Sequence, residues 1–141
     1  MEPAETGFFW PVRVYYEDTD AGGVVYYANY LKFFERARTE RLRAMGFEQD
    51  TLRAEHGVLF AVRSVQAEYL KPARFNDKLQ VTAEISELKR ASLSFTQEIR
   101  REGPAGDLLC QASIRIVCLT ADMLRPTAIP DFLLQRIKDE F

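Results

Sequence analysis

Three carboxylates and two adjacent glycines lie together in one short segment, between a predicted strand and a predicted helix. They are Glu17, Asp18, Asp20, Gly22 and Gly23. A carboxylate can act as a base or as a nucleophile. The first N–H groups of a helix have no partner within the helix and carry partial positive charge, so they can stabilise an oxyanion. This segment is therefore the candidate active site.

The spacing leaves open which acid reacts. Asp18 and Asp20 project to the same side if the strand register continues through them, and two like charges held together favour acid or base chemistry. In the alternative interpretation, an aspartate before Gly-Gly only shapes the turn by binding nearby N–H groups. Gly22 and Gly23 either let a ligand approach the main chain closely or form an ordinary tight connection.

Motifs for several other chemistries are missing. The sequence has no G-x-S-x-G, no G-x-x-x-x-G-K-[ST], no G-x-G-x-x-G and no H-E-x-x-H. His56 is the single histidine and lies in a predicted loop, which favours a surface or capping role over catalysis. Cys110 and Cys118 are an even number of residues apart in one predicted strand and are interpreted as core thiols. We expect no metal and no cofactor.

One long helix is predicted from residue 27 or 28 to about Met45. No Gly or Pro interrupts it, Asn29 is a candidate N-terminal cap and Gly46 supplies the C-terminal stop. Its apolar side chains cover about half of the circumference, which is wider than the ~100° stripe of a surface helix. A sheet is therefore expected to curl around this helix.

For some side chains of this helix, the helical spacing does not decide whether they lie in the core, in a pocket or in solvent. Arg38 and Arg41 fall inside the apolar arc, so we expect them to reach solvent or to pair with Glu35 or Asp50. Aromatic side chains near the helix start suit an acyl pocket as well as a core, and they are Tyr26, Tyr27, Tyr30, Phe33 and Phe34.

Alternation of apolar and polar residues predicts five strands. The first covers residues 9–17 and ends at the acidic turn. The others cover residues 58–70, 77–88, 91–101 and 108–119, after a short helix or loop at 47–56 and before a closing helix at 130–141. Short connectors at 89–90 and 103–107 suit antiparallel hairpins. The prediction is an α+β fold with one antiparallel sheet on one helix, in a single domain of residues 1–141.

Composition argues against several function classes. The formal net charge is −2, which gives no general attraction to nucleic acid. The apolar runs are short and the N-terminus has no cationic segment, so we expect no signal peptide, no membrane insertion and a cytoplasmic location. Lys71 with Arg74, and Lys89 with Arg90 and Ser92, are either solvated turn residues or contacts for the phosphates of a large anionic substrate.

Residues 16–26, together with 29–30 and 34–40, resemble the hot-dog-fold acyl-CoA thioesterases of the 4-hydroxybenzoyl-CoA thioesterase family. Among these they are most similar to the YbgC-type bacterial thioesterases associated with the Tol-Pal system. The similarity extends through residues 68–69, 72–74, 92–97 and 126–130. It implies a curved antiparallel sheet around the long helix. It also implies homodimers or homotetramers with active sites at the subunit interface.

The resemblance implies hydrolysis of an acyl-CoA thioester with Asp20 as the catalytic carboxylate. Tyr27 is expected to donate its backbone N–H to the thioester oxygen. The other expected substrate contacts are Gly22, Gly23 and Val24 in the acidic segment, Val62, Arg63 and Ser64 on a strand, and Lys89, Arg90 and Ser92 for the CoA phosphates. Many YbgC-type members carry histidine where this chain has Tyr27, which leaves the preferred acyl group open.

Two alternatives differ in chemistry. A hot-dog dehydratase or hydratase would pair a histidine with the acid, and His56 is poorly placed for that role. A non-catalytic protein that binds acyl thioesters, or a scaffold that contacts an acyl carrier protein, would bind its ligand without releasing thiol. An acyl carrier protein is also an alternative to CoA as the carrier of the acyl group.

Overall fold

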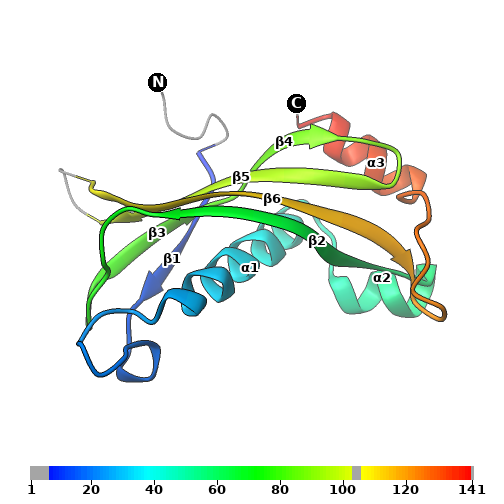
Figure 1. The fold of residues 1–141 in the computed structure, drawn as a ribbon. Helices are drawn as coiled ribbons and strands as arrows, with labels where there is room; N and C mark the ends of the chain where they lie inside the picture. The colour runs from blue at the N-terminus through cyan, green and yellow to red at the C-terminus, as the bar shows by residue number, and fades with distance from the viewer. Residues whose placement is uncertain (1–6, 103–105, 141) are drawn as a thin grey trace.

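The computed structural model describes residues 7–102 and 106–140, and its main feature is a curved antiparallel sheet packed on a long helix (Figure 1). The strands are β1 (Phe9–Arg13), β2 (Val58–Tyr69), β3 (Lys78–Thr82), β4 (Glu84–Leu88), β5 (Ser92–Arg101) and β6 (Leu108–Thr120). The helices are α1 (Tyr27–Ala44), α2 (Gln49–His56) and α3 (Asp131–Lys138), with a 3-10 turn, η1, at Tyr16–Asp18. The predicted α+β class is confirmed.

The sheet follows the order β1-β3-β5-β6-β2, and β4 pairs with β5. Every strand pair is antiparallel. Within residues 7–102 and 106–140, β2 has β6 as its single neighbour, so its other side is an open edge. The sheet curves around α1, as the wide apolar arc of the helix predicted (Figure 1).

The core lies between α1 and the concave face of the sheet. Buried positions on the helix follow helical spacing, and those on β5 and β6 alternate along each strand. The two cysteines belong to this core, because both are fully buried on β6. Burial raises the pKa of Cys110 to about 12 and that of Cys118 to about 11, so both thiols stay protonated at neutral pH. Their interpretation as core thiols is confirmed.

Two predicted strands are shorter than expected. The first ends at Arg13, and residues 16–18 form η1 instead of continuing the strand. The predicted strand 77–88 divides into β3 and β4 at Ala83. Gln97 explains the division, because its Nε2 donates to the Thr82 carbonyl at 2.9 Å, while the Thr82 hydroxyl accepts from the Glu98 N–H at 2.9 Å. Side-chain bonds therefore replace the main-chain ladder at this point.

The two arginines of the apolar arc are buried, and each binds a residue that the sequence did not suggest, while the expected partner Glu35 acts on Arg38 through its charge. Arg38 donates to the Gln97 Oε1 at 3.0 Å, and burial lowers the pKa of its guanidinium. Arg41 forms an ion pair of 3.4 Å with Glu140, and its guanidinium lies over the Phe8 ring at 5.6 Å. The arginines thus join the helix to β5 and to the end of the chain.

Two predictions extend beyond the described residues. The 103–107 connector includes residues 103–105, and the expected closing helix reaches residue 141; these positions lie outside the described part. In that part, α3 confirms a helix at 131–138, and no helix is long and apolar enough to cross a membrane.

Candidate active site

The acidic segment forms a compact loop between β1 and α1. Its first part is η1, and the carboxylate of Asp18 turns back to accept the Tyr15 N–H at 2.9 Å. The strand register expected to align Asp18 with Asp20 therefore ends before either residue. Asp18 takes the turn-shaping role that the sequence left as an alternative.

Asp20 lies at the exposed tip of this loop. Its N–H donates to the Val24 carbonyl at 2.9 Å, and its Oδ1 accepts the Gly22 N–H at 2.8 Å. Gly23, whose φ is +82°, donates its own N–H to the Asp20 carbonyl at 3.0 Å. Glycine suits this position because other residues rarely adopt such a φ. The loop thus fixes both the main chain and one carboxylate oxygen of Asp20, while the residue as a whole stays exposed.

Helix α1 begins directly after this loop, with Tyr26 as its N-cap. No side chain caps it and no acid lies in its first turn. Within residues 7–102 and 106–140, the N–H groups of Tyr27 and Ala28 have no acceptor. The helix start therefore presents two open donors and partial positive charge to a bound oxyanion.

Asn29 is not the helix cap that the sequence suggested. It lies in the first turn of α1, and its side-chain amide donates to the Asp18 carbonyl at 2.9 Å. The cap prediction failed because a short polar residue near a helix start can bind a loop carbonyl as well as a helix N–H.

The connection between β2 and β3 forms the wall behind the loop. Val24 pairs with Arg74, and the Val25 N–H donates to the Ala73 carbonyl at 2.8 Å. The buried hydroxyl of Tyr30 accepts the Ala73 N–H at 2.9 Å. Ala73 therefore uses both of its main-chain groups to hold the acidic loop and α1 together.

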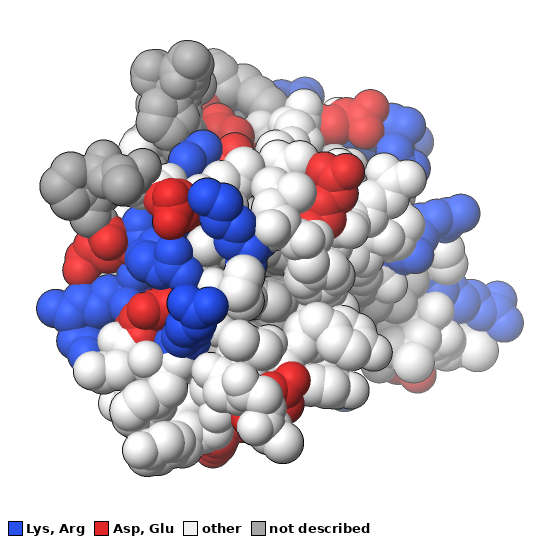
Figure 2. Space-filling view, turned by 60° about the vertical axis from the view of Figure 1, so that its left-hand side comes forward, with Lys and Arg blue, Asp and Glu red and all other residues white. Residues whose placement is uncertain are grey.

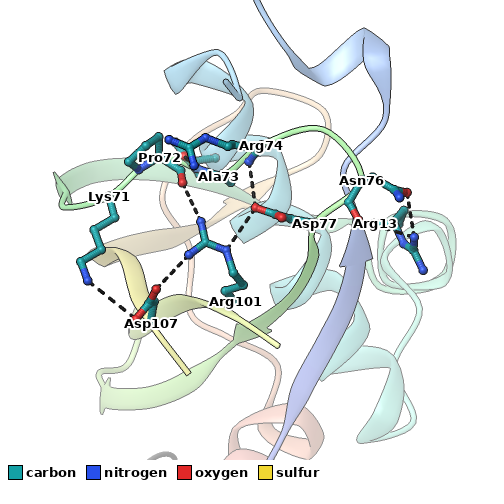
Figure 3. A network of polar contacts seen from close by, with 10 residues as sticks. Arg13, Lys71, Pro72, Ala73, Arg74, Asn76, Asp77, Arg101 and Asp107 are labelled. Atoms are coloured by element: carbon teal, nitrogen blue, oxygen red, sulfur yellow. Dashed lines mark hydrogen bonds and ion pairs between the residues drawn. The ribbon is translucent and has the colours of Figure 1, made fainter. Parts of the chain in front are cut away.

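Arg101 braces this wall through three contacts (Figure 3). Its guanidinium donates to Asp77 at 3.2 Å, to Asp107 at 2.9 Å and to the Pro72 carbonyl at 2.9 Å. Asp77 in turn accepts the Arg74 N–H at 2.9 Å. These bonds fix the backbone on which the acidic loop rests.

Basic and acidic side chains occur together at this end of the molecule (Figure 2). Lys71 lies 3.7 Å from Asp107, which also binds Arg101. Of the side chains expected to contact phosphates, Lys71 is therefore used within the network of Figure 3.

A small pocket of about 220 Å³ lies between α1 and the end of β2. Its lining includes Val25, Tyr27, Tyr30, Tyr69, Leu70 and Lys71. The Tyr27 and Tyr69 rings meet edge to face at 6.0 Å. Sequence reasoning missed Tyr69 and Leu70 as pocket residues, although two successive apolar residues at the end of the long predicted strand were a usable signal. Both side chains are exposed in the structure.

The tyrosine hydroxyls here are not bases at neutral pH. A hydrogen bond with the Tyr27 side chain raises the pKa of Tyr26, and the Asp20 charge adds to that effect. Burial raises the pKa of Tyr30 and Tyr69. The hydroxyls of these three residues are therefore available as neutral donors.

The remaining predicted contacts lie away from Asp20 within one copy of the chain. Val62, Arg63 and Ser64 occupy a bulge of β2, and Tyr69 lies seven positions after Val62, a distance on the order of 20 Å. Lys89, Arg90 and Ser92 lie at the β4–β5 hairpin, at the opposite end of the sheet from the acidic loop (Figure 1). A single copy thus holds Asp20, Gly22, Gly23, Val24 and Tyr27 together, without the other six predicted residues.

His56 is exposed at the end of α2 and packs on the Phe132 ring at 4.5 Å. Among the residues that the structure describes, no group of three or more His, Cys, Asp or Glu side chains is arranged for a metal ion.

A family model for the thioesterase-like superfamily matches residues 14–137. The acyl-CoA thioester hydrolase YbgC of Escherichia coli O6:H1 is 47% identical over 133 residues, covering 94% of this chain and 97% of the relative. The acyl-CoA thioesterase YbgC of Haemophilus influenzae is 45% identical over 126 residues, covering 89% and 90%.

The fold is also shared with a crystal structure of 4-hydroxybenzoyl-CoA thioesterase, in which a mutated enzyme with asparagine in place of aspartate holds 4-hydroxybenzoyl-CoA. The TM-score is 0.85 at 23% identity, covering 92% of this chain and 96% of that one. The chain therefore belongs to the thioesterase-like superfamily, as a hot-dog-fold member of the YbgC family.

Proposed function

We propose that this protein hydrolyses acyl-CoA thioesters to a free acid and CoA, with Asp20 as the catalytic carboxylate. The observation that carries the proposal is the loop that holds Asp20 directly before the uncapped start of α1. Its relatives in Escherichia coli and Haemophilus influenzae are acyl-CoA thioesterases by name, which supports the same substrate class.

The thioester carbonyl oxygen would lie against the Tyr27 N–H, where the helix start stabilises the negative charge that develops on it. Asp20 would either attack the carbonyl carbon, giving a mixed anhydride, or remove a proton from an attacking water. In both routes the bond to sulfur breaks and the CoA thiolate leaves. A crystal structure of 4-hydroxybenzoyl-CoA thioesterase holding its substrate used an aspartate-to-asparagine mutant, which supports a central role for an aspartate in this fold.

A homodimer or homotetramer would complete the site. The open edge of β2 carries exposed Val62 and Val65, and an apolar open edge favours pairing with another strand. Pairing of β2 with itself around a twofold axis is antiparallel. With the twofold axis between Val65 and Gln66, Val62, Arg63 and Ser64 of one copy would lie beside residues 67–69 of the other, next to its Tyr69 and Tyr27.

The carrier of the acyl group, the cellular location and the partner system are also proposals. An acyl carrier protein in place of CoA stays a proposed alternative carrier, with Lys89, Arg90 and Ser92 as proposed phosphate contacts from a second copy. A cytoplasmic location, predicted from the short apolar runs and the N-terminus, and a link to the Tol-Pal system, implied by the family resemblance, remain predictions.

The test is a panel of acyl-CoA and acyl-carrier-protein thioesters with a free-thiol readout. Asp20→Asn should reduce kcat by about 10²- to 10⁴-fold, the range typical of a lost general base. Asp18→Asn is the matched control, because its amide oxygen can still accept the Tyr15 N–H, and it should keep most activity. Wild-type turnover by a folded Asp20→Asn protein would exclude this role of Asp20, and tight binding without any thiol release would exclude hydrolysis.

A further inference from the structure

Asn29 lies at a junction between the two parts of the proposed catalytic site. On one side is the loop that carries Asp20, and on the other is the first turn of α1 with the Tyr27 N–H. Only two asparagines occur in the chain, Asn29 and Asn76. The side chain of Asn29 leaves its own helix and crosses to the loop, where its Nδ2 binds the Asp18 carbonyl at 2.9 Å.

The Asp18 carbonyl is held from two directions. The Tyr26 N–H, from the residue that caps α1, also donates to it at 2.9 Å. At the same time the Asp18 carboxylate accepts the Tyr15 N–H. Asp18 is thus anchored through both its main chain and its side chain, two residues before Asp20.

The loop itself is short between this anchor and the helix. The Asp20 N–H binds the Val24 carbonyl, and Thr19 pairs with Val25. Because these bonds join residues 19–20 to residues 24–25, we expect the loop to move largely as one unit. Its position relative to α1 is therefore determined by the contacts of Asp18 with Tyr26 and Asn29 at its base, together with the bonds that Ala73 makes to Val25 and Tyr30.

We infer that Asn29 is a positioning residue, which acts through the Asp18 carbonyl to fix the distance between the Asp20 carboxylate and the Tyr27 N–H. The inference rests on the proposed thioesterase function. A carbonyl carbon under attack must lie close to the carboxylate or its water while the carbonyl oxygen meets the N–H. A displacement of about 1 Å in such an arrangement can reduce the rate by about 10²-fold.

Within residues 7–102 and 106–140, the bond to the Asp18 carbonyl is the single hydrogen bond of the Asn29 side-chain amide. It does not cap α1, and its N–H donates to the Tyr26 carbonyl within the first turn. An alanine at this position would be well tolerated by a helix. Loss of the amide should therefore displace the loop that carries Asp20 more than it destabilises helix α1.

The experiment compares Asn29→Ala, which removes the donor, with Asn29→Ser, which keeps a shorter one. For acyl-CoA hydrolysis we expect kcat to fall about 10- to 100-fold in Asn29→Ala and less in Asn29→Ser. KM should change by less than about threefold, because the proposed substrate contacts remain. Asn76→Gly is the control: it removes the amide that binds Arg13 at 2.8 Å, and glycine suits its φ of 71°.

Wild-type kcat in folded Asn29→Ala, or a loss confined to KM, would overturn the inference. A loss of the same size in Asn76→Gly would show a general effect of surface bonds and would also overturn it. If Asn29→Ala does not fold, Asn29→Ser provides the test: a fall in kcat with nearly unchanged KM supports the inference, and wild-type kcat or a loss confined to KM overturns it. Absence of thiol release by the wild-type protein would instead reject the proposed function, so the two failures are distinguishable.

Discussion

The Oδ1 of Asp20 accepts the N–H of Gly22 at 2.8 Å, and the same oxygen would lie 3.2 Å from a Cβ atom built on Gly22. The glycine therefore has two roles at one place. Its N–H orients the carboxylate, and its missing side chain leaves room for that orientation.

Gly22→Ala should consequently reduce activity with little loss of stability. The added methyl group must displace the carboxylate by a few tenths of an ångström, and we expect kcat to fall about tenfold. Thermal unfolding and thioester hydrolysis of the same preparation measure the two effects.

Gly46→Ala provides the contrasting control. Gly46 follows α1 with a φ of +97°, and a Cβ there meets no atom within 4 Å. The strained backbone should lower the free energy of unfolding by about 1 kcal/mol while the folded enzyme keeps its kcat. A loss of stability without a loss of kcat in Gly22→Ala, together with a loss of kcat in Gly46→Ala, would contradict the role of Gly22 in orienting Asp20.

A second prediction concerns Arg101, which holds the wall behind the acidic loop. Arg101→Met leaves Asp77 and Asp107 without this partner and removes the donor to the Pro72 carbonyl. We expect the free energy of unfolding to fall by about 1–3 kcal/mol, since the groups are only partly exposed. Urea unfolding measures it.

Arg43→Met is the matched control, because Arg43 also binds two carboxylates, those of Glu40 and Glu48, but on an exposed helix face. Exposed ion pairs contribute little, so its unfolding midpoint should stay at the wild-type value. Equal midpoint shifts in the two variants would refute the special role of Arg101.

Period-two alternation and helical spacing were sufficient to predict most of the fold. They identified α1, β2, β5 and β6 within one or two residues, because burial on one face determines these patterns. They failed where a side chain replaced the main-chain partner, as Gln97 does at the break between β3 and β4. Such a bond joins residues 15 positions apart and leaves no periodic signal.

The part of the candidate site that lies within one short segment of the sequence was predictable. Asp20, Gly22, Gly23 and Tyr27 are close in sequence, so a single loop brings them together. The contributions of Ala73, Tyr69 and Arg101 depend on strand order and on side-chain bonds across the sheet, which one sequence does not encode in its spacing. Asn29 was predicted to cap α1, whereas its side chain binds the Asp18 carbonyl.

A third prediction tests the open edge of β2. Val65→Lys places a charge on an exposed apolar position of this strand, and charged residues oppose strand pairing at an edge. We expect a lower assembly state by light scattering together with reduced thioester hydrolysis, because a second copy would no longer complete the site. Ala54→Lys on the exposed face of α2 should leave both unchanged. An unaltered mass for Val65→Lys, measured at the same protein concentration, would argue against pairing through β2.

The last prediction concerns the two core thiols. Burial raises the pKa of Cys110 to about 12 and that of Cys118 to about 11, from an ordinary value of 9.0. The folded protein therefore keeps these protons at a pH where the unfolded chain loses them. Ionisation of the unfolded chain favours unfolding as the pH rises, so their contribution is complete below about pH 9 and decreases toward about pH 11.

Urea unfolding between pH 7 and 11 measures this decrease, and the Cys110→Ala, Cys118→Ala double variant separates it from other groups that titrate in the same range. The variant should lose less of its stability over this interval than the wild type does. A thiol reagent at pH 8 should react with neither cysteine in the folded protein and with both in urea, since the thiolate is the reactive form. Rapid labelling of the folded protein, or identical pH dependence in the double variant, would show that burial does not protect these thiols. The same protection keeps the protein's own thiols silent in a free-thiol assay of thioester hydrolysis.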